Sequence, residues 1–218
     1  DHLVGGLVGQ LSAGAEIYQS FVNGDVKSYM VGGIGAFVFG DVKECYVKGS
    51  LSGEYVGGFA VQLSLSDKQK VAGNVQDCYI KATITGESST SKVAGVATYV
   101  IYPANVERCI ISVTFAGQGS KYYESYTDTR TGLYNLINGI AGTKLGTINN
   151  IVIDESLNTG EIVKNGGLIN RKGQNVFYTN TDTINSGAEF YKDKGFNTHE
   201  DGVWKMTAQK YPQLFHLN

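Results

Sequence analysis

The chain has 218 residues, enough for one domain with a substantial core, and its 18 Lys and Arg against 20 Asp and Glu leave a formal net charge of −2. This balance gives no electrostatic reason to expect nucleic acid or an anionic membrane as a partner. Gly is abundant at 29 residues and Pro is scarce at 2, which excludes a collagen-like chain and a proline-rich linker. Because no run of 18 apolar residues occurs, we expect no direct membrane insertion.

A repeated unit dominates the sequence, and residues 31–51 (VGGIGAFVFGDVKECYVKGSL) show it most clearly. Each unit opens with a Val-Gly-Gly-aliphatic box and continues with a segment in which apolar and polar residues alternate. The boxes begin at Val4, Val31, Val56 and Val93, with degenerate copies at Leu133 and Asn165. The alternating segments begin at Ile17, Val42, Val75, Val106, Ile148 and Val176.

Aligned units form columns of like residues. One column reads Ser20, Cys45, Cys78, Cys109, Ile151 and Thr179, and another, two residues later, reads Val22, Val47, Ile80, Ile111 and Ile153. Strands alternate their side chains between two faces, so units stacked in register bring equivalent inward residues together. The columns predict an all-β fold, a right-handed parallel β-helix of about six coils. The Gly pairs are expected at turns that need positive φ or a close backbone approach.

After Asn180 the repeat is lost. We therefore predict repeats over residues 1–183 and a C-terminal cap of the same domain over residues 184–218. The open end of a solenoid exposes apolar core and unpaired strand edges, which a cap must cover. The expected covering residues are Phe190, Phe196, Trp204, Tyr211 and Leu214.

The sequence contains none of the catalytic or metal-binding motifs that we searched for. His199 has no second His four residues later, as a zinc-protease helix requires, and neither a P-loop nor a G-x-S-x-G elbow is present. We predict no catalytic, cofactor-binding or metal-binding residue, and no cofactor. The shared column predicts that Cys45, Cys78 and Cys109 are buried, reduced and stacked in series. A Cys45–Cys78 disulfide remains the alternative, although parallel inward side chains give it a poor dihedral angle.

Carboxylates on the outer face keep an enzyme hypothesis open. Glu44, Asp77 and Arg108 occupy the outward position before the cysteine column. Paired carboxylates on neighbouring coils would suit a β-helix polysaccharide-cleaving enzyme. The presence of Lys43 and Arg108 favours a solvated face of mixed charge instead.

Binding is the better-supported class of function. The residue after the cysteine position is apolar in successive units, reading Phe21, Tyr46, Tyr79, Ile110 and Val152. Alternatively, loops or a neighbouring domain cover this stripe, and it is not a binding surface. A second candidate is the long excursion at residues 117–130, with Tyr122, Tyr123 and Tyr126, because Tyr is enriched in interfaces and a loop of this length is either functional or disordered.

The boxes also carry a family resemblance. Gly6-Leu7-Val8-Gly9 resembles the signature of the GLUG repeat, and degraded forms stand at residues 33–35 and 58–60. The tail from Ala188 to Leu214 looks like the segment that closes such arrays. The resemblance implies a secreted or wall-attached bacterial surface protein of Gram-positive type, such as an adhesin or the repeat region of a streptococcal-type immunoglobulin A zinc metalloprotease.

That resemblance implies a non-catalytic role in recognition, adhesion or spacing. Because the chain begins inside the first box, we expect it to be a piece of a longer polypeptide. The expected partner is a host protein or glycan, and we expect the isolated domain to be a monomer.

Overall fold

The computed structural model describes residues 2–64, 72–101, 103–123, 146–159, 162, 175–198, 202–206 and 212–214. Strands account for 57% of the structure and helices for 7%, which confirms the all-β prediction. The degenerate boxes at Leu133 and Asn165 lie outside the described residues. No helix in the described ranges is long and apolar enough to cross a membrane.

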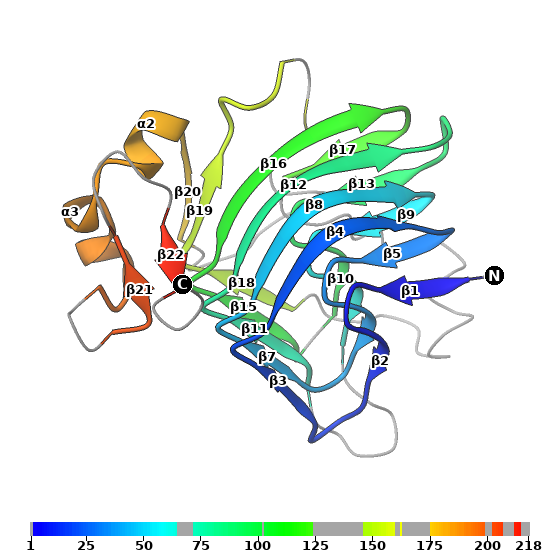
Figure 1. The fold of residues 1–218 in the computed structure, drawn as a ribbon, viewed down its shortest axis with the longest axis horizontal. Helices are drawn as coiled ribbons and strands as arrows, with labels where there is room; N and C mark the ends of the chain where they lie inside the picture. The colour runs from blue at the N-terminus through cyan, green and yellow to red at the C-terminus, as the bar shows by residue number, and fades with distance from the viewer. Residues whose placement is uncertain are drawn as a thin grey trace.

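Four successive repeats contribute four strands each (Figure 1). The first repeat holds β1 (Leu3–Gly5), β2 (Val8–Leu11), β3 (Glu16–Tyr18) and β4 (Phe21–Lys27), and the second holds β5 (Met30–Gly32), β6 (Gly35–Val38), β7 (Asp41–Lys43) and β8 (Tyr46–Gly53). The third holds β9 (Tyr55–Gly57), β10 (Ala60–Leu63), β11 (Asn74–Gln76) and β12 (Tyr79–Gly86), and the fourth holds β13 (Lys92–Ala94), β14 (Ala97–Val100), β15 (Asn105–Glu107) and β16 (Ile110–Gly117). The later strands are β17 (Ser120–Tyr122), β18 (Thr147–Asn149), β19 (Ile151–Asp154) and β20 (Val176–Thr179).

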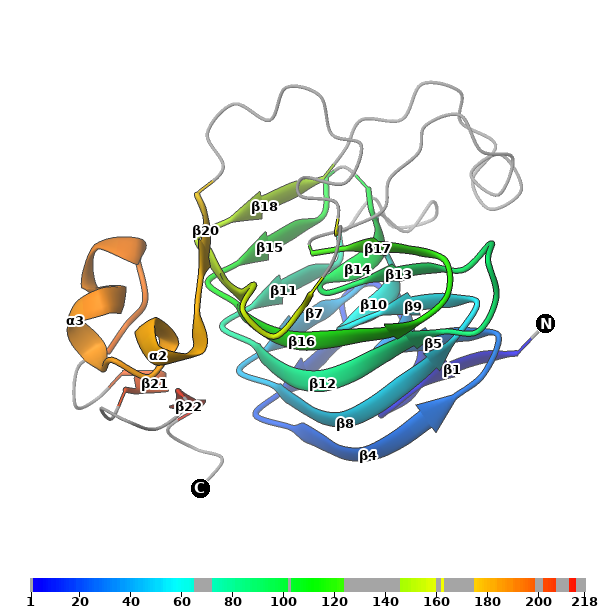
Figure 2. The ribbon, with the colours of Figure 1, turned by 90° about the horizontal axis from the view of Figure 1, so that it is seen from above.

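Equivalent strands of successive repeats pair in parallel, so each sheet takes one strand from each repeat (Figure 2). The sheet orders are β1-β5-β9-β13-β17, β2-β6-β10-β14, β3-β7-β11-β15-β18 and β4-β8-β12-β16-β19-β20. The last of these, the six-stranded sheet, contains the longest strands and pairs Val22 with Val47, Ile80, Ile111 and Ile153 in succession. The structure therefore has the predicted register as far as Ile153. In β20 the prediction is wrong, because Val176 and not Thr179 lies opposite Ile151, and Thr179 pairs with Asp154.

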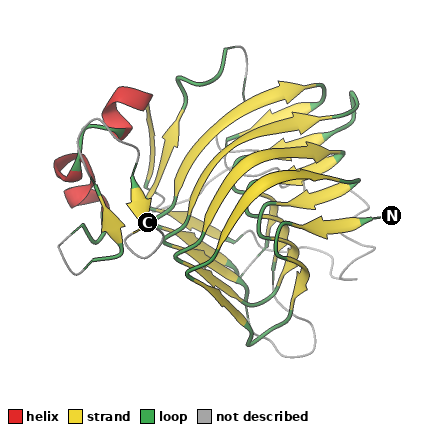
Figure 3. Cartoon of the chain, in the orientation of Figure 1, coloured by secondary structure: helices red, strands yellow, loops and turns green. Residues whose placement is uncertain are grey.

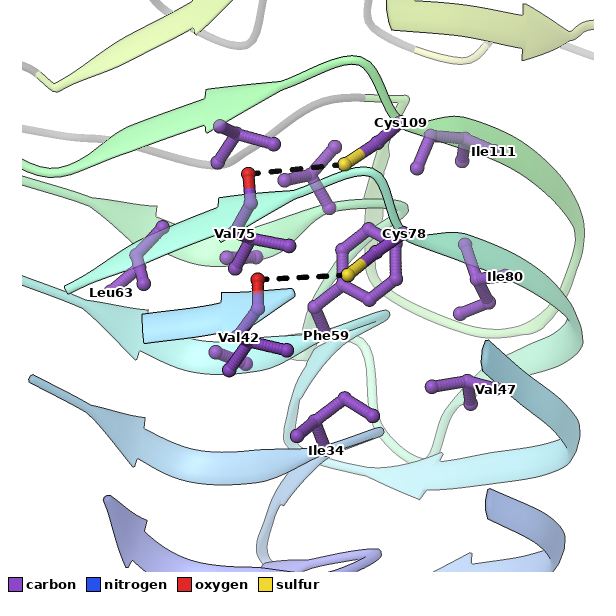
Figure 4. Packing of buried hydrophobic residues seen from close by; sticks show 14 of the residues in the cluster. Ile34, Val42, Val47, Phe59, Leu63, Val75, Cys78, Ile80, Cys109 and Ile111 are labelled. Carbon is purple, nitrogen blue, oxygen red and sulfur yellow. Dashed lines mark hydrogen bonds between the residues drawn. The ribbon is translucent and has the colours of Figure 1, made fainter. Parts of the chain in front are cut away.

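The core lies between the sheets and consists of the inward columns. Cys45, Cys78 and Cys109 are free and fully buried in it, which confirms the predicted thiol ladder. The amide of Cys45 donates to the Sγ of Cys78 at 3.4 Å. Figure 4 shows the thiols of Cys78 and Cys109 donating to the carbonyl oxygens of Val42 and Val75, at 3.7 and 3.9 Å.

The corners of the repeats differ from the prediction. Within the described residues no box glycine has a positive φ; instead a non-glycine residue adopts the left-handed conformation just before the cysteine column in five successive repeats. These residues are Gln19, Glu44, Asp77, Arg108 and Asn150, with φ between 46 and 52°. Each one turns the chain from the sheet that contains β3 into the six-stranded sheet. The left-handed conformation costs backbone energy in these residues, because their Cβ atom lies close to the backbone.

The box glycines serve close backbone approach. A Cβ at Gly33 would collide with the carbonyl oxygen of Gly58 in the next repeat, and a Cβ at Gly58 would collide with that of Gly95. Glycine therefore recurs at this position because no side chain fits between the stacked backbones, whereas the preceding box position, Gly57, holds Ala94 in the next repeat.

The described part of the C-terminal segment comprises α2 (Thr181–Ile184), α3 (Ala188–Tyr191), the 3-10 turn η1 (Lys192–Lys194) and the antiparallel pair β21 (Trp204–Lys205) and β22 (Gln213–Leu214). We expected this segment to cover the open end of the repeats. Its buried residues pack instead on the outer face of the six-stranded sheet, beside the repeats (Figures 1 and 3). They are Ile184, Tyr191, Phe196, Trp204 and Leu214. Tyr211 lies outside the described residues.

The collision at Gly33 makes a direct test of the box. Gly33→Ala should lower the free energy of unfolding by at least about 1–3 kcal/mol, because the methyl group overlaps the carbonyl group of Gly58 in the next repeat, which cannot move independently. Gly24→Ala is the matched control, since its Cβ would meet nothing within 4 Å. Chemical denaturation of both variants measures the difference, and equal stabilities would contradict the stacked-backbone account.

The thiol ladder generates a second prediction. Burial raises the pKa of the Cys78 thiol well above its usual value, whereas the hydrogen bond with Cys78 lowers the pKa of Cys45. All three thiols are fully buried, so a thiol reagent cannot reach them in the folded protein whatever their pKa. Thiol titration of the native protein should show little reactivity, and all three thiols should react after denaturation. Rapid labelling of two or more thiols in the folded state would contradict this burial.

Substitution of Cys78 tests the same column. Cys78→Asp should unfold the domain, because it would bury a carboxylate without a partner. Cys78→Ser should remain folded, since Ser20 occupies this column in the first repeat. Circular dichroism of the two variants distinguishes the cases, and a folded Cys78→Asp protein would show that the column is not sealed from water.

Candidate binding surface

The outer face of the six-stranded sheet carries one continuous apolar column, called the outer stripe below. Its members occupy equivalent positions and pair in sequence along the sheet. They are Phe21, Tyr46, Tyr79, Ile110, Val152 and Phe177. The stripe was predicted up to Val152, and Phe177 extends it.

The C-terminal segment covers the later part of the outer stripe. Tyr79, Ile110 and Val152 are buried in one cluster with Tyr191 and Trp204. The alternative interpretation was cover by loops or a neighbouring domain; this part of the stripe is covered instead by the C-terminal segment of the same chain. Tyr79 is only 4% exposed, so its prediction as a surface residue is wrong.

Trp204 fixes the C-terminal segment through one of the outward carboxylates. Its indole Nε1 donates to Oδ1 of Asp77 at 3.2 Å, while Arg108 binds both oxygens of the same carboxylate at 2.9 Å. This ion pair raises the pKa of Arg108. Asp77 is buried, so its carboxylate positions an indole and a guanidinium. Glu44, the other carboxylate of the enzyme hypothesis, accepts a hydrogen bond from Gln19 at 3.0 Å.

The first part of the outer stripe lies beyond the C-terminal segment. Phe21 is 58% exposed, the largest value among the exposed apolar side chains of the described residues. Tyr46 is half-buried, and its ring stacks on that of Tyr79 with centroids 5.1 Å apart and planes 13° apart. Stacking on a buried ring holds Tyr46 in one orientation, which makes this end of the stripe a preformed aromatic surface.

Two charged residues lie next to this aromatic surface, and the sequence analysis did not single them out. Lys48 and Lys81 are paired neighbours on β8 and β12, both exposed, two residues after Tyr46 and Tyr79. Their outward position follows from strand alternation, so the signal was present in the columns. The next outward column holds Asp25, which accepts a hydrogen bond from Ser50.

The tyrosine-rich excursion does not form the expected surface in its described part. Tyr122 and Tyr123 are buried at 9% and 4% exposure, which contradicts their prediction as recognition residues. Tyr122 ends β17 and pairs with Ala94, and the ring of Tyr123 packs edge-on against Phe115 with centroids 6.0 Å apart. Tyr126 lies outside the described residues.

No metal site emerges from the ranges that the structure describes, where no group of three His, Cys, Asp or Glu side chains could hold an ion. His199 is outside these ranges. Comparison with protein-family models, with curated proteins and with solved structures gave no match to this chain.

The anchor of the C-terminal segment can be tested by mutation. Trp204 is 1% exposed and packs edge-on against Phe196, so Trp204→Ala should cost about 3–5 kcal/mol of stability. Trp204→Phe should cost less, because it keeps most of the aromatic packing and loses the hydrogen bond to Asp77. Thermal denaturation measures both. Unchanged stability in Trp204→Ala would contradict a structural role for the indole.

Proposed function

We propose that this chain is a non-catalytic recognition or adhesion domain of a large bacterial surface protein, either secreted or attached to the cell wall. The resemblance of its boxes to GLUG repeats supports that location and a parent such as an immunoglobulin A-type metalloprotease, in which the domain would recognise substrate. The in-register parallel sheets support the finer architecture, a right-handed β-solenoid of about six coils. The C-terminal segment then acts as a lateral cover.

The exposed end of the outer stripe carries this proposal. Phe21 and Tyr46 project from neighbouring strands, paired in register, on a sheet whose inner face is packed in the core. A rigid platform loses little conformational entropy on binding, and aromatic rings supply contact area at low entropic cost. The proposed ligand is a host protein or a glycan. A single copy of the domain binds it, and no cofactor takes part.

Paired substitutions test the platform. Phe21→Ser combined with Tyr46→Ser should abolish binding to any ligand that the wild-type domain captures on host-protein and glycan arrays. Tyr29→Ser is the control, because Tyr29 is 44% exposed and is not part of the outer stripe. Equal loss of binding in the control, or full binding by the double variant, would contradict the proposed surface.

A parallel assay addresses the non-catalytic part of the proposal. The wild-type domain should release no new reducing ends from the polysaccharides on the array. Release that is lost in Glu44→Gln would instead establish the glycan-cleaving activity.

A further inference from the structure

The large apolar side chains that are exposed in the described residues all lie in the first repeat or at its junction with the second. They are Leu3, Leu7, Tyr18, Phe21 and Tyr29, between 41 and 58% exposed. The four strands of the same repeat, β1 to β4, each stand at the end of their sheet (Figure 2). The first repeat therefore forms one end of the stack, where strand edges and apolar side chains are exposed together.

The edge of β4 differs from the other three edges. β1, β2 and β3 have 3, 4 and 3 residues, whereas β4 has 7. Sheet edges are normally protected by short strands, by proline or by charged side chains. β4 contains no proline, and its two charged residues are engaged with later repeats. Asp25 accepts a hydrogen bond from Ser50, and Lys27 forms an ion pair with Glu87 at 2.7 Å. β4 thus presents the longest and least protected edge of the first repeat.

The free edge of β4 consists of the backbone groups of its odd-numbered residues. The carbonyl oxygen of Ser20 accepts from the amide of Tyr46 at 3.0 Å, and the amide of Ser28 donates to the carbonyl oxygen of Ser52 at 3.1 Å. Backbone groups of successive strand residues point to opposite sides, so the even-numbered residues face β8 and the odd-numbered ones face away from the sheet. Among the described strands, only β8 pairs with β4. The residues that face away are Phe21, Asn23, Asp25 and Lys27.

The side-chain columns are also incompletely covered at β4. Val26 is half-buried, whereas Leu51, its neighbour on β8, is 1% exposed. On the outer face, Phe21 is 58% exposed. A further strand with apolar residues opposite Val22 and Val26 would cover the inward column, and its outward residues would lie beside the ring of Phe21. The edge therefore offers side-chain contacts on both faces in addition to its backbone groups.

We propose that the free edge of β4 binds an extended segment of a host protein, which adds to the six-stranded sheet as a parallel strand. The outward N–H and C=O groups repeat about every 6.6 Å, the spacing of an extended polypeptide, and a glycan has no backbone amides to match them. Every strand pair in this sheet is parallel, so the added strand continues the same pattern. The inference rests on the recognition role proposed above and names the class of ligand for the same end of the sheet.

A synthetic peptide with the sequence of residues 20–28 (SFVNGDVKS) is the probe, because it carries valines at the positions that match Val22 and Val26. In a parallel strand in register, the peptide's even-numbered residues face β4. N-methylation of the peptide at Val22 and Gly24 should therefore weaken binding by about tenfold or more, the effect of losing two hydrogen bonds. N-methylation at Asn23 and Asp25 is the matched control and should leave binding unchanged. Calorimetric titration of the wild-type domain measures all three peptides.

A proline substitution locates the binding on the domain. Asn23→Pro removes an N–H that faces the free edge and leaves the hydrogen bonds to β8 in place, as proline does on an edge strand. It should abolish peptide binding while the circular dichroism spectrum stays that of the wild type. Asn23→Ala is the control and should bind the peptide normally.

Amide hydrogen exchange of the wild-type domain tests the same edge without any substitution. In the free domain, the amides of Asn23 and Asp25 should exchange faster than those of Gly24 and Val26, which donate to β8. Saturation with the peptide should protect Asn23 and Asp25. Nuclear magnetic resonance follows each amide separately.

Four outcomes would overturn the inference: no binding of the peptide, equal weakening by the two pairs of N-methyl groups, normal binding by a folded Asn23→Pro variant, and unchanged exchange at Asn23 and Asp25 in the complex. Weakening only by the methyl groups at Asn23 and Asp25 would overturn the parallel direction, because an antiparallel strand places these groups against β4. If an array ligand is lost in the Phe21 and Tyr46 variant but retained by Asn23→Pro, the recognition role stands and strand addition is wrong. If neither variant affects any ligand, both proposals fail.

Discussion

In-register stacking of parallel strands is the constraint on which the rest of the structure depends. Every inward side chain meets its equivalent about 4.8 Å away, so one unsuitable residue disturbs two neighbouring repeats. The column of Cys45, Cys78 and Cys109 therefore holds small apolar thiols, and the box holds glycine where the backbones come closest. Hydrophobic burial stabilises the stack, while strand pairing fixes which residues share each column.

The same register organises the outer surface. Outward residues repeat along the sheet as the inward ones do, so a preference at one position becomes a row of similar side chains. The outer stripe is such a row, and the lysine pair beside it is another. Because the chain itself covers the stripe from Tyr79 onward, the free surface is confined to the first two repeats, where Phe21 and Tyr46 lie.

The sequence predicts the stacked elements well and the single-copy elements poorly. Register and cysteine burial were predictable because each column is sampled in several repeats. The left-handed corner was not, since the residues that adopt it are polar in the way that any outward position can be: amides, carboxylates and a guanidinium share this backbone conformation. Tyr122 was assigned to a loop, although it occupies the strand position of Ala94, because the box around it has lost its glycines.

The sequence does carry a signal for where the C-terminal segment packs, in the outward column of the six-stranded sheet. Ile110 and Val152 are aliphatic at an outward position, and both are fully buried by the C-terminal segment. Phe21 and Tyr46 occupy the same column in the repeats that the segment leaves uncovered. Aliphatic residues suit a permanently dry contact, whereas aromatic rings offer flat contact area and, in tyrosine, a hydroxyl for a wet interface. The aliphatic pair therefore marks the centre of the internal contact, and aromatic residues lie on both sides of it, covered at Tyr79 and Phe177 and exposed at Phe21.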